Sequence, residues 1–142
     1  MTASIVYTGN LRCRAEHIQS GSIMETDAPT DNRGKGEKFS PTDLTCASLA
    51  TCMLTTMAIK ANDMEVNLAD AHADVTKHML SDPRRIGKIE VTVTLPSGVN
   101  ENDRRILEKT GDNCPVVKSL HPDIKLMIDY KWTLPNFSRE RT

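Results

Sequence analysis

Residues 40–59 read SPTDLTCASLATCMLTTMAI and decide the fold of this chain. Ser40 is a good helix N-cap, Pro41 suits the first helical position, and Asp43 puts a carboxylate at the positive end of the helix dipole. Residues 44–59 carry no charge. This run is shorter than the roughly 20 apolar residues that span a bilayer. Small or apolar residues occur on every face, so we expect a helix that is buried all round.

The chain as a whole is short, nearly neutral and poor in aromatic residues. It has 142 residues, with 18 basic against 19 acidic side chains and a net charge of −1. Charge therefore gives no case for nucleic acid or an anionic membrane as a partner. The length predicts a single domain, residues 1–142. Only 4% of the residues are aromatic, and a homodimer that shares one core would help to cover the central helix.

Hydrophobic patterns on both sides of this helix predict an α+β fold with an antiparallel sheet. The expected strands are residues 4–8, 11–18, 22–26, 66–79, 88–95 and 124–134, and residues 136–142 are expected to form a loose tail. Gly9-Asn10 is a hairpin signal, and a phase change near Ala69 suggests a bulge. A second helix, residues 101–110, is expected between an N-cap at Asn100 and a stop at Gly111.

The four cysteines indicate thiol chemistry rather than disulfides or a metal site. The N-terminus has no secretory signal, so we expect a cytoplasmic protein with free thiols, and no Cys or His spacing suits a metal. Pro115 at a first helical position makes Cys114 an N-cap, where a thiolate is favoured. With Cys52 on the buried helix, it forms what a two-cysteine redox site needs. The alternative is plain packing, which is our interpretation of Cys13 and Cys46.

Three segments resemble the OsmC/Ohr family of thiol-dependent organic hydroperoxide reductases: Ser40-Pro41-Thr42-Asp43-Leu44, residues 47–52, and Asn113-Cys114-Pro115-Val116. The resemblance extends over nearly the whole chain and implies one OsmC-like domain. It also implies an intertwined homodimer, in which two six-stranded antiparallel sheets wrap around two central helices. The implied activity is a peroxidase of oxidative-stress defence that reduces organic hydroperoxides to alcohols. An external dithiol supplies the electrons, and no cofactor is used.

The same resemblance assigns roles to individual residues. Cys52 matches the peroxidatic cysteine and Cys114 matches the resolving one. The family also uses an arginine, oriented by a glutamate, to stabilise the thiolate and polarise the peroxide. Arg33 is the best match to that arginine, and its fixed fork of donors suits both the sulfur and a peroxide oxygen. Arg12 and Arg14 are the next candidates.

One departure from the family motif leaves a second interpretation open. Thr42 stands where the well-characterised peroxidases carry the glutamate, so Asp43 is the acid left to orient the arginine. The alternative function is a non-catalytic OsmC-like dimer. Such a dimer binds a small apolar ligand in an interface cavity lined by Met53, Leu54 and Met57, or acts as a thiol sensor.

Overall fold

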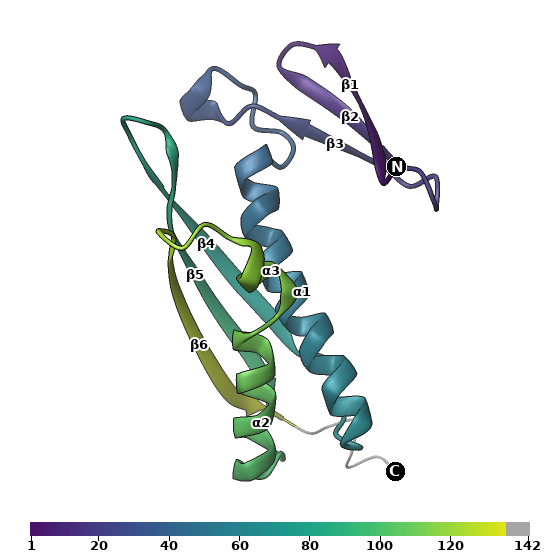
Figure 1. Ribbon diagram of the computed structural model, residues 1–142, viewed down its shortest axis with the longest axis vertical. Helices are drawn as coiled ribbons and strands as arrows, with labels where there is room; N and C mark the ends of the chain where they lie inside the picture. Colours follow the sequence, from purple (N-terminus) through teal and green to yellow (C-terminus); the bar gives the residue numbers. More distant parts are fainter. Residues whose placement is uncertain (136–142) are drawn as a thin grey trace. The chain divides into compact units, whose positions relative to one another are not determined.

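The computed structural model describes residues 1–135 and confirms the α+β class. The chain forms two compact units, residues 1–45 and the residues from Cys46 onward. Each unit contains a three-stranded sheet (Figure 1). The expected tail, residues 136–142, lies outside the described residues.

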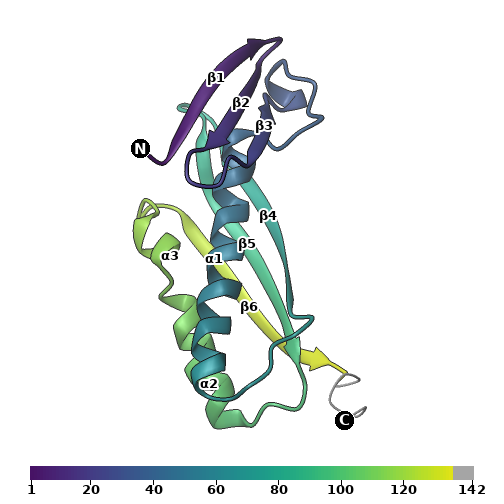
Figure 2. The same ribbon diagram turned by 90° about the vertical axis from the view of Figure 1, so that its right-hand side faces the viewer.

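The first unit is an antiparallel sheet followed by a loop. Its strands are β1 (Ala3–Gly9), β2 (Arg12–His17) and β3 (Ile23–Asp27), and the loop contains the short 3-10 helix η1 (Thr30–Asn32). The strands lie in the order β1-β2-β3 (Figure 2). Gly9, Asn10 and Leu11 have φ values of 95°, 55° and 62°. This left-handed backbone closes the hairpin between β1 and β2. The predicted hairpin is confirmed, but its two turn residues are Asn10 and Leu11, one position later than the predicted Gly9-Asn10, because Gly9 pairs with Arg12.

Helix α1 (Pro41–Asp63) begins where the sequence predicts, because its first turn is capped in both directions. The backbone N–H of Asp43 donates to Ser40 Oγ at 3.0 Å. In return, the backbone N–H of Ser40 donates to Asp43 Oδ2, also at 3.0 Å. This reciprocal arrangement is a capping box, with Asp43 in the place usually held by glutamate. Pro41 occupies the first helical position, where its missing N–H costs nothing.

Only one face of α1 is buried, so the expectation of a helix buried all round is wrong for the single chain. The buried residues recur at intervals of three and four, as on a helix with one core-facing stripe. They are Cys46, Leu49, Ala50, Met53, Met57 and Ala61. Thr51, Thr55 and Ile59 are exposed. The threonines on the other face carry hydroxyl groups that water can solvate, so the chain has no need to cover them.

The length of α1 also differs from the expectation. The helix has 23 residues, and by length and composition it is the one helix within residues 1–135 that could cross a bilayer. A core helix of a water-soluble protein passes the same test. The buried face of α1 packs in one hydrophobic cluster with β5 and Leu107, which is the behaviour of a core helix.

The second unit is a mixed sheet with helices on one face (Figure 1). Its strands are β4 (His72–Leu80), β5 (Arg85–Pro96) and β6 (Lys125–Leu134), in the order β4-β5-β6, and its further helices are α2 (Glu101–Asp112) and α3 (Pro115–Ser119). β4 and β5 pair antiparallel, but β5 and β6 pair parallel. The expectation of a purely antiparallel sheet is therefore wrong. The α2–α3 connection carries the chain back along the sheet before β6 begins, and such a crossover joins parallel strands.

Strand β4 is shorter than the sequence pattern suggests. Residues 64–71 connect α1 to β4, and Val66 and Leu68 pack against the core from this connection. They are apolar without being part of the strand, which explains why their phase disagrees with that of β4. The irregularity in pairing lies between His78 and Met79, not near Ala69. The alternation predicted for β5 is confirmed, since its inward side chains are at most 1% exposed: Ile89, Val91, Val93 and Leu95.

Helix α2 has the predicted beginning but not the predicted end. The backbone N–H of Asp103 donates to Asn100 Oδ1 at 2.9 Å, which confirms the N-cap. The helix continues through Gly111, where we expected it to stop. A Cβ at Gly111 would lie 2.6 Å from Tyr130 Oη and 2.9 Å from Met57 Sδ. Glycine therefore serves the close packing of α2 against its neighbours rather than helix termination.

Candidate functional site

The second unit brings two cysteine thiols together. Cys52 lies on α1, and Cys114 lies between α2 and α3, 62 residues later in the sequence. The two side chains hydrogen bond to each other. Cys52 is half-buried, whereas Cys114 is fully buried. Of the site residues named from the sequence, these two are therefore in direct contact.

The environment of Cys52 favours its ionised form. Burial alone would raise the pKa of this thiol. Hydrogen bonds from the backbone N–H of Val116, the Cys114 thiol and the Thr56 hydroxyl outweigh that effect and hold the pKa of Cys52 below its usual value. Thr56 Oγ1 lies 3.8 Å from Cys52 Sγ, within hydrogen-bonding distance for sulfur. Donors of this kind stabilise a thiolate more than a neutral thiol.

The environment of Cys114 favours its protonated form. Cys114 is the N-cap of α3, and Pro115 follows at the first helical position, as the sequence predicts. The N-cap position does favour a thiolate, but other effects outweigh it, and the expected thiolate at Cys114 does not result. Burial and the neighbouring Cys52 raise the pKa of Cys114, although the N–H groups of Val117 and Val116 act in the opposite direction. The dry surroundings of this thiol disfavour its charged form.

The pair is thus asymmetric: a readily ionised thiol lies beside one that keeps its proton. The thiolate form is the nucleophile of cysteine chemistry. An oxidised Cys52 would have a second thiol at hand to form a disulfide. The structure shows Cys52 and Cys114 as two free thiols.

Arg33 and Asp43, the other expected site residues, belong to the first unit. Arg33 is exposed at the C-terminal end of η1, with a φ of 68°. The Asp43 carboxylate takes part in the capping box of α1. Arg12, a further candidate, is bound by Asp27: its Nε lies 2.6 Å from Oδ1 and its Nη2 2.9 Å from Oδ2. This bidentate hydrogen bond holds the pKa of Asp27 below its usual value and raises the pKa of Arg12.

The methionines expected to line a ligand cavity belong to the core instead. Met53 and Met57 are fully buried in the hydrophobic cluster. Leu54 is partly buried and packs against the same cluster. These side chains fill space in the single chain, as methionine does in most cores.

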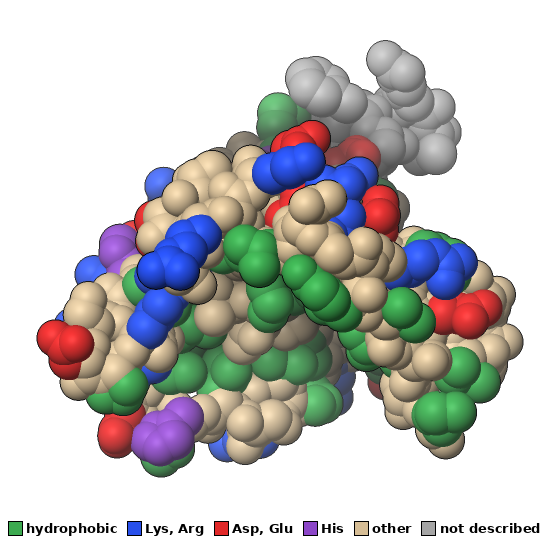
Figure 3. All heavy atoms as spheres, turned by 90° about the horizontal axis from the view of Figure 1, so that it is seen from above, with side chains coloured by type: hydrophobic (Ala, Val, Ile, Leu, Met, Phe, Trp, Pro, Cys, Tyr) green, Lys and Arg blue, Asp and Glu red, His purple; other side chains and the backbone are tan. Residues whose placement is uncertain are grey.

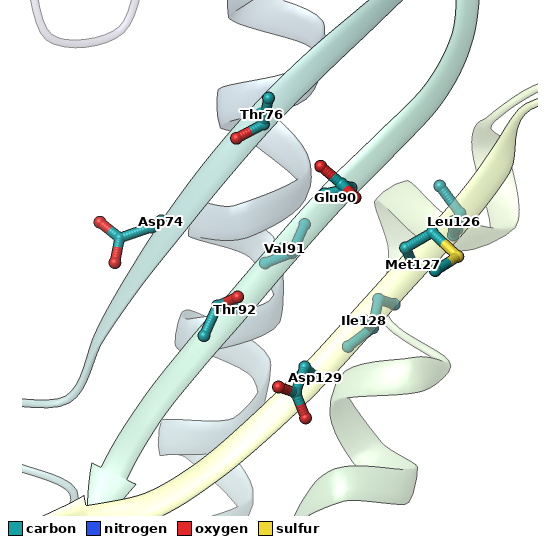
Figure 4. A pocket seen from close by; sticks show the side chains of 9 residues that line it. All are labelled: Asp74, Thr76, Glu90, Val91, Thr92, Leu126, Met127, Ile128 and Asp129. Atoms are coloured by element: carbon teal, nitrogen blue, oxygen red, sulfur yellow. The ribbon is translucent and has the colours of Figure 1, made fainter.

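A shallow cleft of about 500 Å³ lies on the opposite face of the β4–β6 sheet from α1 (Figure 4). Its polar lining includes the carboxylates of Asp74, Glu90 and Asp129 and the hydroxyl groups of Thr76 and Thr92. The cleft contains no thiol. Within residues 1–135, no group of three or more His, Cys, Asp or Glu side chains is arranged to hold a metal ion.

Two groups at the cysteine pair were missed in the sequence. Thr56 lies four residues after Cys52, and residues at this spacing are neighbours on a helix surface. The predicted helix could therefore have indicated Thr56. The contact of the Val116 N–H with Cys52 depends on how α3 packs against α1, and no local pattern signals it.

Comparisons with known proteins agree with this fold. A family model described as OsmC-like protein matches residues 34–129. A solved structure from Psychrobacter arcticus 273-4, of a candidate osmotic stress induced and detoxification response protein, is 46% identical with a TM-score of 0.88, and the match covers 92% of this chain and 95% of that chain. No curated protein matches the chain.

Two further structures are similar in fold at low identity. An organic hydroperoxide resistance protein OsmC from Legionella pneumophila is 16% identical with a TM-score of 0.73, covering 92% of this chain and 97% of that one. An organic hydroperoxide resistance protein from Elizabethkingia anophelis is 13% identical with a TM-score of 0.74, covering 94% and 97% respectively.

Proposed function

Because this chain belongs to the OsmC-like protein family, we propose that it is a thiol-dependent peroxidase that reduces organic hydroperoxides to alcohols. The observation that carries the proposal is the hydrogen-bonded pair of Cys52 and Cys114, whose pKa values move in opposite directions. The names of the Legionella pneumophila and Elizabethkingia anophelis proteins support organic hydroperoxides as the substrate class.

In the first proposed step, Cys52 is the nucleophile. Its thiolate attacks the distal oxygen of the hydroperoxide, so that an S–O bond forms while the O–O bond breaks. The alkoxide that leaves takes a proton and becomes the alcohol, and Cys52 becomes a sulfenic acid. The hydrogen bonds from Val116 and Thr56 favour this step, because they increase the population of the thiolate near neutral pH.

In the second proposed step, Cys114 resolves the sulfenic acid. The Cys114 sulfur attacks the Cys52 sulfur and forms a disulfide. The hydroxyl group leaves with the Cys114 proton as water. Two electrons from an external dithiol then reduce the disulfide and restore both thiols, so the cycle requires no bound cofactor.

The roles of the first-unit residues belong to the same proposal. Arg33 is exposed, so its guanidinium is open to solvent and to ligands. Its proposed role is to stabilise the Cys52 thiolate and to polarise the peroxide. The fork of Arg12 is already occupied by Asp27, which makes Arg12 the weaker candidate. In this proposal Asp43 orients the arginine. It takes the role of the family glutamate, whose position is occupied by Thr42 in this chain.

A homodimer is the proposed assembly. On β1, the consecutive residues Ile5, Val6 and Tyr7 are each more than half exposed, and successive residues of a strand point to opposite faces. Hydrophobic side chains also interrupt the polar surface in several places (Figure 3). A second copy of the chain would cover such surfaces. In the proposed dimer, a three-stranded sheet of each copy would contribute to each six-stranded sheet that the family resemblance implies. The proposed location is the cytoplasm, where a reducing environment keeps thiols of this kind free.

The test is the consumption of cumene hydroperoxide with dithiothreitol as reductant. We expect turnover by the wild type and by Cys13→Ser, a control at another partly exposed thiol, and a loss of turnover in Cys52→Ser. After one equivalent of peroxide, the intact mass of the wild type should fall by two hydrogens, mapped to a Cys52–Cys114 disulfide. Equal, slow consumption by the wild type and Cys52→Ser would refute the peroxidase. A stable sulfenic acid in its place would favour the thiol-sensor alternative.

A further inference from the structure

The hydroxyl group of Tyr130 holds the last turn of α2, directly before Cys114. Tyr130 lies on β6, opposite the fully buried Val93 of β5. Its single hydroxyl proton has two acceptors within reach, Asp112 Oδ1 at 2.8 Å and the carbonyl oxygen of Glu108 at 3.1 Å, and the shorter bond is the one to Asp112. Asp112 is the last residue of α2 and comes two residues before Cys114. Strand β6 is therefore bonded to the end of α2, directly before Cys114.

Close packing at Gly111 strengthens the same connection. A Cβ there would lie 2.6 Å from Tyr130 Oη and 2.9 Å from Met57 Sδ, so the turn fits tightly between β6 and α1. The backbone N–H of Cys114 donates to the Gly111 carbonyl oxygen at 3.3 Å. Cys114 is thus bonded to the turn that Tyr130 holds. Met57 lies on the same helix as Cys52. The contact at Gly111 therefore joins the helix that carries Cys52 to the turn that precedes Cys114.

A second aromatic residue of β6 anchors α2 one turn earlier. Trp132 Nε1 donates to Glu108 Oε2 at 3.0 Å. The guanidinium of Arg104, also on α2, lies over the Trp132 ring, 5.5 Å from its centroid. These contacts fix the body of α2, whereas Tyr130 bonds to Asp112 and lies against Gly111 at its end. The hydroxyl of Tyr130 is therefore the group whose removal would affect the position of Cys114 most specifically.

We propose that Tyr130 is a positioning residue for Cys114, and that its bonds to α2 hold this thiol where it can attack an oxidised Cys52. The inference rests on the proposed peroxidase function. The two cysteine Cα atoms must come within about 4.4–6.8 Å for a disulfide, so a small displacement of the turn matters. A misplacement of about 1 Å can cost as much as two orders of magnitude in rate.

The state of the hydroxyl suits this role. Burial, the hydrogen bond to Asp112 and the nearby negative charges all raise the pKa of Tyr130. Tyr130 thus keeps its proton throughout the working range of a thiol enzyme and remains a donor to α2. The group does not touch the reacting sulfur atoms, and its effect should be confined to the step in which the Cys114 sulfur displaces hydroxide from Cys52 as water.

The test separates the two oxidation steps in Tyr130→Phe, which keeps the ring and removes only the hydroxyl. After one equivalent of cumene hydroperoxide, quenched samples are analysed by intact mass, with dimedone to trap the sulfenic acid. We expect the rate of Cys52 oxidation to stay within about twofold of the wild type. Disulfide formation should slow by about three- to tenfold, a part of the full effect of losing one hydrogen bond to a charged group, because the turn keeps its other contacts. More Cys52 should then reach the sulfinic acid at high peroxide.

Two further variants keep the inference open to refutation. Thr110→Val removes another hydroxyl group of α2, which donates within the helix to the Ile106 carbonyl oxygen at 2.8 Å, and should match the wild type in both steps. Asp112→Asn keeps an acceptor without the charge and should give an intermediate effect on disulfide formation, even if Tyr130→Phe folds poorly.

The outcomes distinguish the inference from the proposed function. Disulfide formation at the wild-type rate in folded Tyr130→Phe and Asp112→Asn would overturn the inference alone. Equal slowing of both steps would also overturn it, because this result indicates a general structural role. If the wild type forms no Cys52–Cys114 disulfide, the proposed function fails and the inference falls with it.

Discussion

Replacing Thr56 with valine should make Cys52 harder to ionise without changing the shape of the helix. Valine has the same branched form as threonine but lacks the hydroxyl that lies 3.8 Å from Cys52 Sγ. That hydroxyl lowers the pKa of Cys52, so its removal should raise the pKa. A single hydrogen bond contributes about 0.5–1.5 kcal/mol, and we take the lower part, about 0.5–1 kcal/mol, because Cys52 is only half-buried. The thiolate population below the pKa should then fall by a factor of about two to five.

The effect on reaction rate has a characteristic dependence on pH. A thiolate of higher pKa is also more nucleophilic, with a Brønsted coefficient of about 0.4–0.5. At pH values below the pKa, Thr56→Val should therefore react about 1.5 to 2.5 times more slowly than the wild type. Above the pKa, where both proteins are ionised, it should react about 1.4 to 2 times faster. The two pH–rate curves should cross.

The assay is the rate of iodoacetamide alkylation of Cys52 from about pH 5 to pH 10, followed by mass spectrometry of the peptide that carries this residue. The wild-type rate should rise as the pH increases through the lowered pKa of Cys52, because the thiolate exists above that pKa. Thr55→Val is the matched control, since Thr55 is exposed on the same turn, and Thr56→Ser should restore wild-type behaviour. A curve for Thr56→Val that superimposes on that of the wild type would refute the role of this hydrogen bond.

Two further predictions concern stability. Gly111→Ala should lower the free energy of unfolding by about 1 kcal/mol in urea denaturation, because overpacking against Tyr130 and Met57 costs about 1–3 kcal/mol, while alanine regains about 1 kcal/mol of helix propensity; an increase in stability would show that the packing yields easily. The hydrogen bond from Arg12 holds the pKa of Asp27 below its usual value. The ionised Asp27 therefore stabilises the folded state fully above about pH 4, the pKa of an aspartate in the unfolded chain. This contribution is lost as the pH falls through the lower pKa of the folded state. Asp27→Asn should therefore reduce the acid dependence of the melting temperature between about pH 2 and pH 5, and an unchanged dependence would contradict the assignment.

The helix that decides the fold was largely predictable from its own residues. The capping box of Ser40 and Asp43 and the cap at Asn100 are local, because the groups that bond are three residues apart. The alternation along β5 was equally readable. The direction of β6 was not, because an alternating strand has the same pattern whether its neighbour runs parallel or antiparallel. The start of β4 was predicted too early, at Val66, for a related reason. Apolar residues pack against a core from loops as well as from strands, so an apolar pattern alone does not mark the first residue of a strand.

The sequence by itself determined the place of Cys52 on an uncharged helix, the N-cap position of Cys114 and the motif that indicates the family. These properties depend on residues close together in the chain. Only the tertiary structure decided that the two thiols meet, that Cys52 is the one with the lowered pKa, and that Tyr130 holds the turn before Cys114. Ionisation depends on burial and on donors brought in by packing, so a residue's position in the sequence cannot settle it. Cys114 shows this most clearly. Its N-cap position favours a thiolate, but its burial raises the pKa and favours the protonated thiol.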